Sequence, residues 1–130
     1  MTNITIMQII LLLIQIESNG QNDAIGDNGR AVGCLQIHEI MVDEVNRIMQ
    51  LKGITKLYTY DDRYSMRESI QMAYIYMTYH VTKEKLGRRP VASDYALSWN
   101  QGSSWHKKKP NQRYLNKFNR ELEKNGFIVN

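Results

Sequence analysis

Glu17 is the residue with the clearest potential for chemistry, because it follows a strongly apolar stretch that runs from Ile4 to Ile16. Gln8 and Gln15 share one narrow polar stripe of a helix, whereas Glu17 lies nine residues after Gln8, about half a turn away from that stripe. It is therefore expected at the end of the apolar face formed by Ile10, Leu13 and Ile14. A carboxyl in apolar surroundings retains its proton at higher pH and can protonate a leaving oxygen, as cleavage of a glycosidic bond requires. The apolar periodicity is also consistent with a glutamate at the end of the helix whose side chain points into water.

The apolar segment that leads to Glu17 is the first of five predicted helices, so the chain is predicted to be all-α. Apolar spacing and capping signals predict these helices at about 4–16, 38–52, 65–87, 91–99 and 111–124. The third begins with the pattern Ser65-x-x-Glu68, which is typical of a capping box. Residues 18–32 are rich in Asn-Gly and Asp-Asn-Gly turn signals, which predict at most a small irregular hairpin.

Length and composition exclude several classes of protein. A chain of 130 residues is predicted to form one domain over residues 1–130, and 42% hydrophobic residues suffice for a packed core. The net charge of +4 favours an anionic partner. One cysteine, Cys34, allows no intrachain disulfide, and the three histidines are too scattered for a local metal motif. Neither a metal nor an organic cofactor is implied.

The apolar stretch 4–16 is interpreted as a buried helix. It is shorter than the ~20 residues that a membrane-spanning helix needs. It also lacks the basic segment and the small-residue cleavage site that are typical of a signal peptide. We therefore predict that this stretch neither spans a membrane nor serves as a signal peptide.

Three short motifs occur in an order that resembles the lysozyme-like lytic transglycosylases and goose-type lysozymes. They are Glu17-Ser18, Gly33-Cys34-Leu35-Gln36 and Trp99-Asn100-Gln101-Gly102. Tyr114 resembles the tyrosine that begins the last helix of that family, so the resemblance runs from about residue 4 to 118. Departures from the family pattern are Cys34 for Leu, Trp99 for Tyr and Gln101 for Ala, and residues 53–65 match no family feature.

The resemblance implies a lysozyme-like helical domain that degrades peptidoglycan by cleaving the β-1,4 bond between N-acetylmuramic acid and N-acetylglucosamine. As a lytic transglycosylase it would use Glu17 as acid and then base, with a 1,6-anhydro product. The alternative is an inverting, goose-type hydrolase with Asp27 of the turn Gly26-Asp27-Asn28-Gly29 as the base. An aspartate in such a turn also commonly caps its own backbone, so both roles of Asp27 remain open. His38 replaces a second active-site Asp of the goose-type enzymes, which weakens the hydrolase alternative.

The resemblance also implies the residues that bind the glycan. Ser18 is expected to orient Glu17, and further contacts are expected from Gln36, Asn100, Gly102 and Tyr114. An internal hydrogen-bonding role is the alternative for Gln36. The loop Trp105 to Lys109 suits anionic groups of a cell wall, and its alternative is a solvated mobile loop.

Partners and location follow from the same resemblance. We expect a monomer that binds peptidoglycan strands, no nucleic acid, and action at the cell wall or periplasm. A virus-encoded or virion-associated lysin would need no leader. A basic helical nucleic-acid-binding module is the rival class, and clustered lysines beside aromatic residues fit it. A relative that binds glycan without cleaving it is the third possibility.

Overall fold

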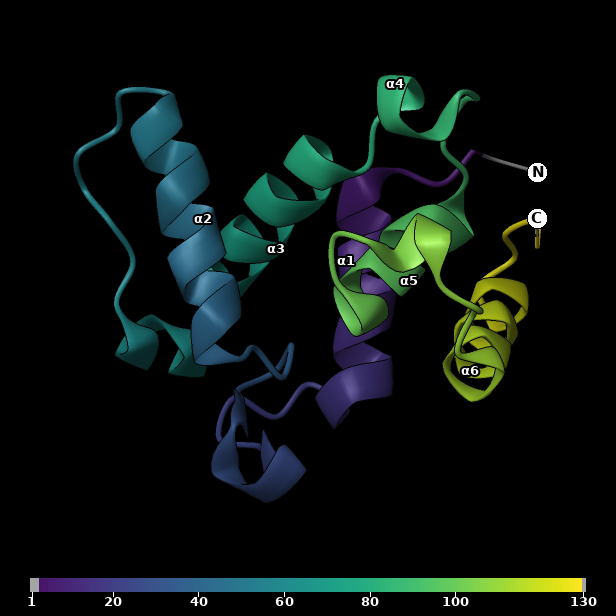
Figure 1. Ribbon diagram of the computed structural model, residues 1–130. Coiled ribbons are helices and arrows are strands. Elements are labelled where there is room, and N and C mark those ends of the chain that lie inside the picture. The colour runs from purple at the N-terminus through teal and green to yellow at the C-terminus, as the bar shows by residue number, and fades with distance from the viewer. Residues whose placement is uncertain (1–2, 130) are drawn as a thin grey trace. The chain divides into compact units, whose positions relative to one another are not determined.

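The computed structural model describes residues 3–129, and helices make up most of this range (Figure 1). Its α-helices are α1 Ile6–Ser18, α2 Glu39–Leu51, α3 Met66–His80, α4 Lys83–Leu86, α5 Ala92–Gln101 and α6 Gln112–Lys124. Short 3-10 turns are η1 Asp27–Gly29, η2 Tyr60–Tyr64 and η3 Trp105–Lys107, and the strands are β1 Ile25–Gly26 and β2 Ala31–Val32. The prediction of an all-α chain with a small hairpin is confirmed. Within the described range, no helix has both the length and the apolar character to cross a membrane.

The chain packs as two compact units whose boundaries fall inside α1 and α3. The first unit comprises residues 1–16 and 77–130, and the second unit comprises residues 17–76. Charge is divided unevenly between them. The first unit has eleven Lys and Arg against four Asp and Glu, a net charge of +7, and the second has six against nine, a net charge of −3. A division into compact packing units does not test whether the chain is one domain or two. The single domain over residues 1–130 therefore stays a prediction.

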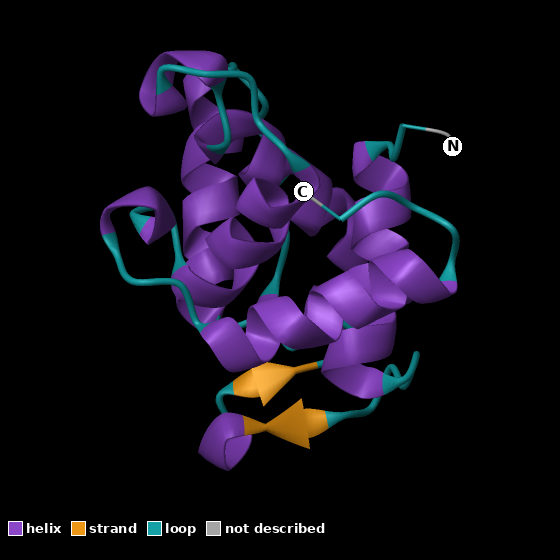
Figure 2. Ribbon diagram, turned by 90° about the vertical axis from the view of Figure 1, so that its right-hand side faces the viewer, coloured by secondary structure: helices purple, strands orange, loops and turns teal. Residues whose placement is uncertain are grey.

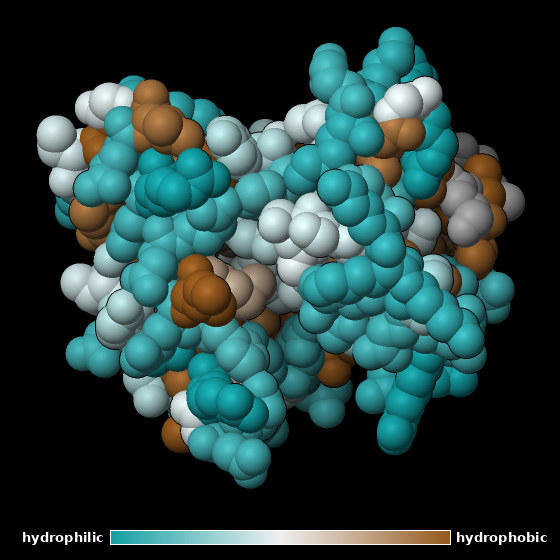
Figure 3. All heavy atoms as spheres, in the orientation of Figure 1, coloured by the Kyte–Doolittle hydropathy of each residue, from teal (hydrophilic) through white to brown (hydrophobic). Residues whose placement is uncertain are grey.

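Polar side chains cover most of the face that Figure 3 presents. Apolar side chains appear there as small, separate patches. A broad exposed apolar area is the usual sign of a protein or membrane interface, and this face does not display one.

A capping box begins α1. The Thr5 amide donates to Gln8 Oε1 at 2.9 Å, and the Gln8 amide donates to Thr5 Oγ1 at 3.2 Å. Gln8 therefore fixes the start of the helix, a role that its place in the polar stripe did not predict. The helix begins at Ile6 and extends through Ser18, two residues beyond its predicted end.

The predicted hairpin lies between α1 and α2 (Figure 2). β1 and β2 pair antiparallel with Ile25 opposite Val32, and η1 forms the turn between them. Val32 makes a further antiparallel bridge to Ile37, so the backbone turns twice within a few residues. This double turn leads the chain into the buried segment Cys34 to Ile37 and on to α2.

Arg63 ties this double turn to η2. Its side chain is nearly buried and donates to the carbonyls of Tyr60 at 2.8 Å and Ile37 at 3.0 Å. A longer contact of 3.4 Å reaches the Arg30 carbonyl. The segment around Arg63, which lies in the stretch 53–65 that matches no family feature, therefore stabilises the second unit.

In the first unit, α5 packs against η3 and α6. Val81, Leu97 and Trp105 form a buried cluster, and Leu86, Tyr95 and Leu115 cover its edge. From α6, the side chains of Tyr114, Phe118 and Leu122 are buried, and their spacing of four residues places them on one face of the helix.

The single helix predicted over 65–87 is wrong in one respect, because the chain breaks after His80 into α3 and α4. Thr82 has extended backbone angles, φ −131° and ψ 152°, and its side chain accepts a bond from the Lys85 amide at 3.1 Å. This bond caps the start of α4. Threonine is more favourable as a helix cap than in the interior of a helix, so the chain starts a new helix here instead of extending α3. The predicted end at Gly87 is correct, with φ 71°.

Asp94 stabilises the start of α5. Its buried carboxylate accepts bonds from Arg88 Nη1 and Nη2 at 2.8 and 2.9 Å, and from the Val91 amide at 2.8 Å. Burial by itself raises the pKa of Asp94, but the bonds from Arg88 and Val91 outweigh burial and hold that pKa below its ordinary value. The stability that Asp94 contributes is therefore present above its ordinary pKa of 3.8 and is lost as pH falls through the lower folded value.

We expect Asp94→Asn to lower the free energy of unfolding near neutral pH by about 2 kcal/mol, because charge-assisted hydrogen bonds are lost while Arg88 remains half exposed to water. Urea denaturation at several pH values measures this. The difference from the wild-type protein should shrink as the pH falls below about 4. Asp61→Asn, at an exposed position, is the matched control and should change little. A difference that grows in acid would contradict the stated role of Asp94.

Candidate active site

Glu17 is the penultimate residue of α1 and is half-buried. Leu13 and Ile14, which lie one turn before it in the same helix, are buried. The apolar face predicted from periodicity therefore exists, and Glu17 stands where that face ends.

Ser18 ends α1 with a hydroxyl that is fully engaged. Its Oγ donates to the Cys34 carbonyl at 2.8 Å and accepts bonds from the amides of Gly20 and Gln21, each at 3.1 Å. These bonds use the one donor and both acceptor positions of a hydroxyl. Ser18 thus attaches the end of α1, beside Glu17, to the segment that carries the second motif.

The second motif forms a tight turn over a glycine. The Gly33 amide donates to the Ala24 carbonyl at 2.8 Å, and a Cβ on Gly33 would lie 1.8 Å from the Arg63 carbonyl oxygen. Gly33 also has φ +86°, where a side chain is disfavoured. This position therefore requires glycine for two independent reasons. Cys34, next to it, is fully buried, and burial raises the pKa of its thiol.

The Gln36 side chain folds back onto the hairpin. Its Nε2 donates to the carbonyls of Gly33 at 3.0 Å and Ala24 at 3.2 Å. A Cβ at Gly26 would approach Gln36 Oε1 to 2.4 Å, so a larger residue there would displace the end of the Gln36 side chain. Gln36 is thus an internal hydrogen bonder in this structure, and its contact with glycan stays a prediction.

Asp27 is paired with side chains on both of its carboxylate oxygens. Oδ1 accepts from Arg30 Nη2 at 3.1 Å, and Oδ2 lies 3.2 Å from Nε2 of His38. About half of the Asp27 side chain is exposed to solvent. Sequence analysis missed this pair, although one signal was present. His38 stands where the goose-type enzymes have an acid, and a histidine can face Asp27 where a second carboxylate would repel it.

The third motif and Tyr114 are joined by Asn111. Its side chain donates to Asn100 Oδ1 at 3.0 Å, and its own Oδ1 accepts from the Tyr114 amide at 3.2 Å, which caps α6. Gln101 also reaches this segment, because its Oε1 accepts from the Asn111 amide and its Nε2 donates to the Lys109 carbonyl, both at 3.0 Å. The departure from Ala at position 101 therefore has a structural use, since an alanine has no side-chain group that could form these two hydrogen bonds.

Gly102 ends α5 with φ +88°, and its amide donates to the Ser98 carbonyl at 3.0 Å. A Cβ here would meet open space, so glycine is needed for its backbone angle rather than for a close neighbour. Tyr114 is 8% exposed and belongs mainly to the core. The motifs thus form two groups, 17–36 in the second unit and 100–114 in the first unit.

A comparison with protein families covers both groups. The family model of the transglycosylase SLT domain matches residues 4–121, which run from before α1 into α6. The chain therefore belongs to the transglycosylase SLT domain family. Members of this family are lytic transglycosylases that act on peptidoglycan, so the chain is an enzyme of peptidoglycan degradation that acts on the cell wall. No curated protein and no solved structure matches the chain significantly.

Proposed function

We propose that the chain cleaves the β-1,4 bond between N-acetylmuramic acid and N-acetylglucosamine as a lytic transglycosylase, with Glu17 as the only catalytic carboxyl. The observation that carries this proposal is the placement of Glu17. It is half-buried at the end of an apolar helix, and the next residue, Ser18, is bonded to the turn of the second motif. This order of motifs lies inside the family match.

In the proposed reaction, the Glu17 carboxyl first donates its proton to the glycosidic oxygen while the bond from that oxygen to C1 of the muramoyl ring breaks. The resulting carboxylate then removes the proton from the 6-hydroxyl of the same ring as that oxygen bonds to C1. A 1,6-anhydro end forms, Glu17 regains its proton, and water is not consumed.

The end of α1 favours this use of Glu17. Partial negative charge at the C-terminal end of a helix disfavours a carboxylate and thus favours the neutral acid that the first step needs. Ser18 acts as a positioning residue, because its bonds to the backbone at Cys34, Gly20 and Gln21 hold the last turn of α1 in place. Contacts with the glycan are proposed for Gln36 in the second unit and for Asn100, Gly102 and Tyr114 in the first unit.

The pairing of Asp27 favours the lyase over the inverting hydrolase. A general base must hold a water molecule, but both Asp27 oxygens already face side-chain partners, Arg30 and His38. The hydrolase remains the second candidate because half of the Asp27 side chain is exposed, so water can approach it.

Mass spectrometry of digested, purified peptidoglycan tests the proposal. We expect 1,6-anhydromuramoyl ends, whereas reducing ends that have gained water would identify a hydrolase, and the absence of fragments would mean binding without cleavage. Asp27→Asn should reduce the rate by less than about tenfold. Asp23→Asn, an exposed aspartate of the same segment, is the matched control. A loss of about 10²- to 10⁴-fold in Asp27→Asn alone would make Asp27 the base.

A further inference from the structure

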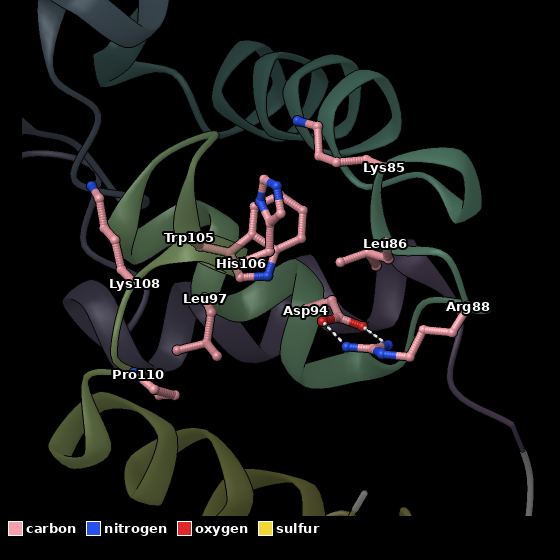
Figure 4. A pocket seen from close by; sticks show the side chains of 9 residues that line it. All are labelled: Lys85, Leu86, Arg88, Asp94, Leu97, Trp105, His106, Lys108 and Pro110. Atoms are coloured by element: carbon pink, nitrogen blue, oxygen red, sulfur yellow. Dashed lines mark hydrogen bonds and ion pairs between the residues drawn. The ribbon is translucent and has the colours of Figure 1, made fainter.

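A second site of a different kind lies in the first unit and includes none of the residues predicted to bind or cleave the glycan. It is a cavity of about 340 Å³ between α4, the start of α5 and the loop through η3 (Figure 4). That volume is at the lower end of the range for small-ligand pockets. The residues that line it are Lys85, Leu86, Arg88, Asp94, Leu97, Trp105, His106, Lys108 and Pro110.

One part of the lining is apolar and packed against buried side chains. Trp105 is 3% exposed and packs in the buried cluster with Val81 and Leu97. The His106 ring meets the Trp105 ring edge to face, with 5.0 Å between ring centroids. The η3 loop is therefore held in place by its tryptophan, and the cavity offers a preformed apolar surface to a ligand.

The remaining lining is positively charged. Arg88 and Asp94 neutralise one another through two bonds, which Figure 4 draws as dashed lines. Lys85 and Lys108 then determine the sign of the cavity, and Figure 4 shows them on opposite sides of the paired rings of Trp105 and His106. Backbone carbonyls orient both ammonium groups, since Lys85 Nζ donates to Ser103 at 3.3 Å and Lys108 Nζ to Gln101 at 2.9 Å. The net charge of +7 on the surrounding unit adds to the attraction for an anion.

His106 adds a polar atom in need of a partner. Among the described residues, its buried Nδ1 has no hydrogen-bond partner. Desolvation lowers the pKa of His106, and the charges of Lys85 and Lys107 lower it further, so the ring is neutral near neutral pH. A buried polar atom without a partner is unfavourable, and a ligand with a matching group would supply the missing hydrogen bond.

We propose that this cavity binds a carboxylate carried on a small apolar group, and that its ligand is a peptide stem of peptidoglycan. The proposal rests on peptidoglycan being the substrate of the proposed function. The apolar surface of Trp105 and Leu97 suits a short aliphatic side chain such as that of alanine, and the positive charge of the lysines in the lining attracts a carboxylate. The site would thus let the enzyme recognise glycan that still carries stems, through residues other than Glu17.

Binding of a small acid and its uncharged analogue tests the chemistry directly. The probes are N-acetyl-alanyl-alanine and the same dipeptide with a C-terminal amide, titrated into the full chain and followed by the NMR signals of the Trp105 indole and the His106 ring. We expect the acid to shift both signals and to bind about tenfold or more tightly than the amide, as loss of one charge-assisted contact implies.

Neighbouring lysines provide a matched pair of variants. Lys108→Ala should weaken binding of the acid about tenfold, whereas Lys109→Ala, which removes the same charge one residue away from the cavity lining, should not. On peptidoglycan, Lys108→Ala should lower the rate on strands with stems and leave the rate unchanged on strands stripped of them.

Several results would overturn the proposal. They are equal binding of acid and amide, equal effects of Lys108→Ala and Lys109→Ala, or tighter Lys108-dependent binding of inorganic phosphate or a short DNA duplex. None of these would alter the products released from peptidoglycan. Conversely, a chain that binds the dipeptide but releases no anhydro ends would refute the proposed function and leave the ligand chemistry of the cavity intact, so the two failures are distinguishable.

Discussion

Glu17→Gln is expected to lose between about 10²- and 10⁴-fold of the rate at which purified peptidoglycan is solubilised. Glutamine has nearly the size and polarity of the acid, but it carries no proton to give to the leaving oxygen and cannot take one from the 6-hydroxyl. Because the same group serves in both steps of the proposed reaction, no other side chain compensates. Chromatography of released fragments measures the rate.

The control for this variant is Glu123→Gln, the same change at an exposed position in the last turn of α6. It should retain the wild-type rate. Both variants should bind insoluble peptidoglycan as the wild-type protein does, which separates lost chemistry from lost binding. A Glu17→Gln protein that is folded and keeps more than about a tenth of the rate would assign the catalytic proton to another group.

Gly33→Ala is expected to destabilise the protein by more than about 4 kcal/mol, or to prevent folding. The new methyl group would lie 1.8 Å from the Arg63 carbonyl oxygen, a backbone atom that cannot rotate away, and φ at Gly33 is +86°. Relieving the overlap would require the double turn to move away from η2. That movement would break the bonds of Arg63 to the carbonyls of Ile37 and Arg30.

Gly29→Ala separates the effect of the steric overlap from that of the backbone angle. Gly29 has φ +87°, but a Cβ added there would meet no heavy atom within 4 Å. It should cost only the backbone term, about 1–2 kcal/mol. Urea denaturation followed by circular dichroism gives the free energy of unfolding of both variants. Equal losses would show that the approach of Gly33 to Arg63 is unimportant and that only the backbone angle matters.

Sequence patterns that act over a few residues predicted most of the elements. The Asn-Gly and Asp-Asn-Gly signals correspond to the observed hairpin, and Gly87 ends α4 as expected. Ser65 and Glu68 do form a pair, since the Glu68 amide donates to Ser65 Oγ at 3.4 Å and the Ser65 hydroxyl donates to the Glu68 carboxylate. These interactions are local, so the identity of the residues is nearly sufficient to predict them.

For the candidate site, the sequence supplied a predicted list of residues but not the contacts that those residues make in the structure. Glu17 and Ser18 stand at the end of a helix with a buried face, as predicted, but the three bonds of the Ser18 hydroxyl were not foreseen. Gln36 donates to the Ala24 and Gly33 carbonyls, an internal role that the sequence offered only as the alternative to a glycan contact. Polar side chains have several possible partners, and the choice among them depends on which backbone groups the fold leaves unpaired.

The amino-acid sequence by itself determined the helical class of this chain, the order of its motifs and its resemblance to the family to which it belongs, because periodicity, caps and turns are encoded over short distances. Only the tertiary structure decided that Arg63 braces the double turn, that His38 faces Asp27, and that Trp105 anchors a cationic cavity. Arg63 and Ile37 are 26 residues apart, and such a contact exists only once the whole path of the chain has formed. Closing the loop between these two residues costs conformational entropy. Burial of the whole core, rather than this one contact, compensates for that cost.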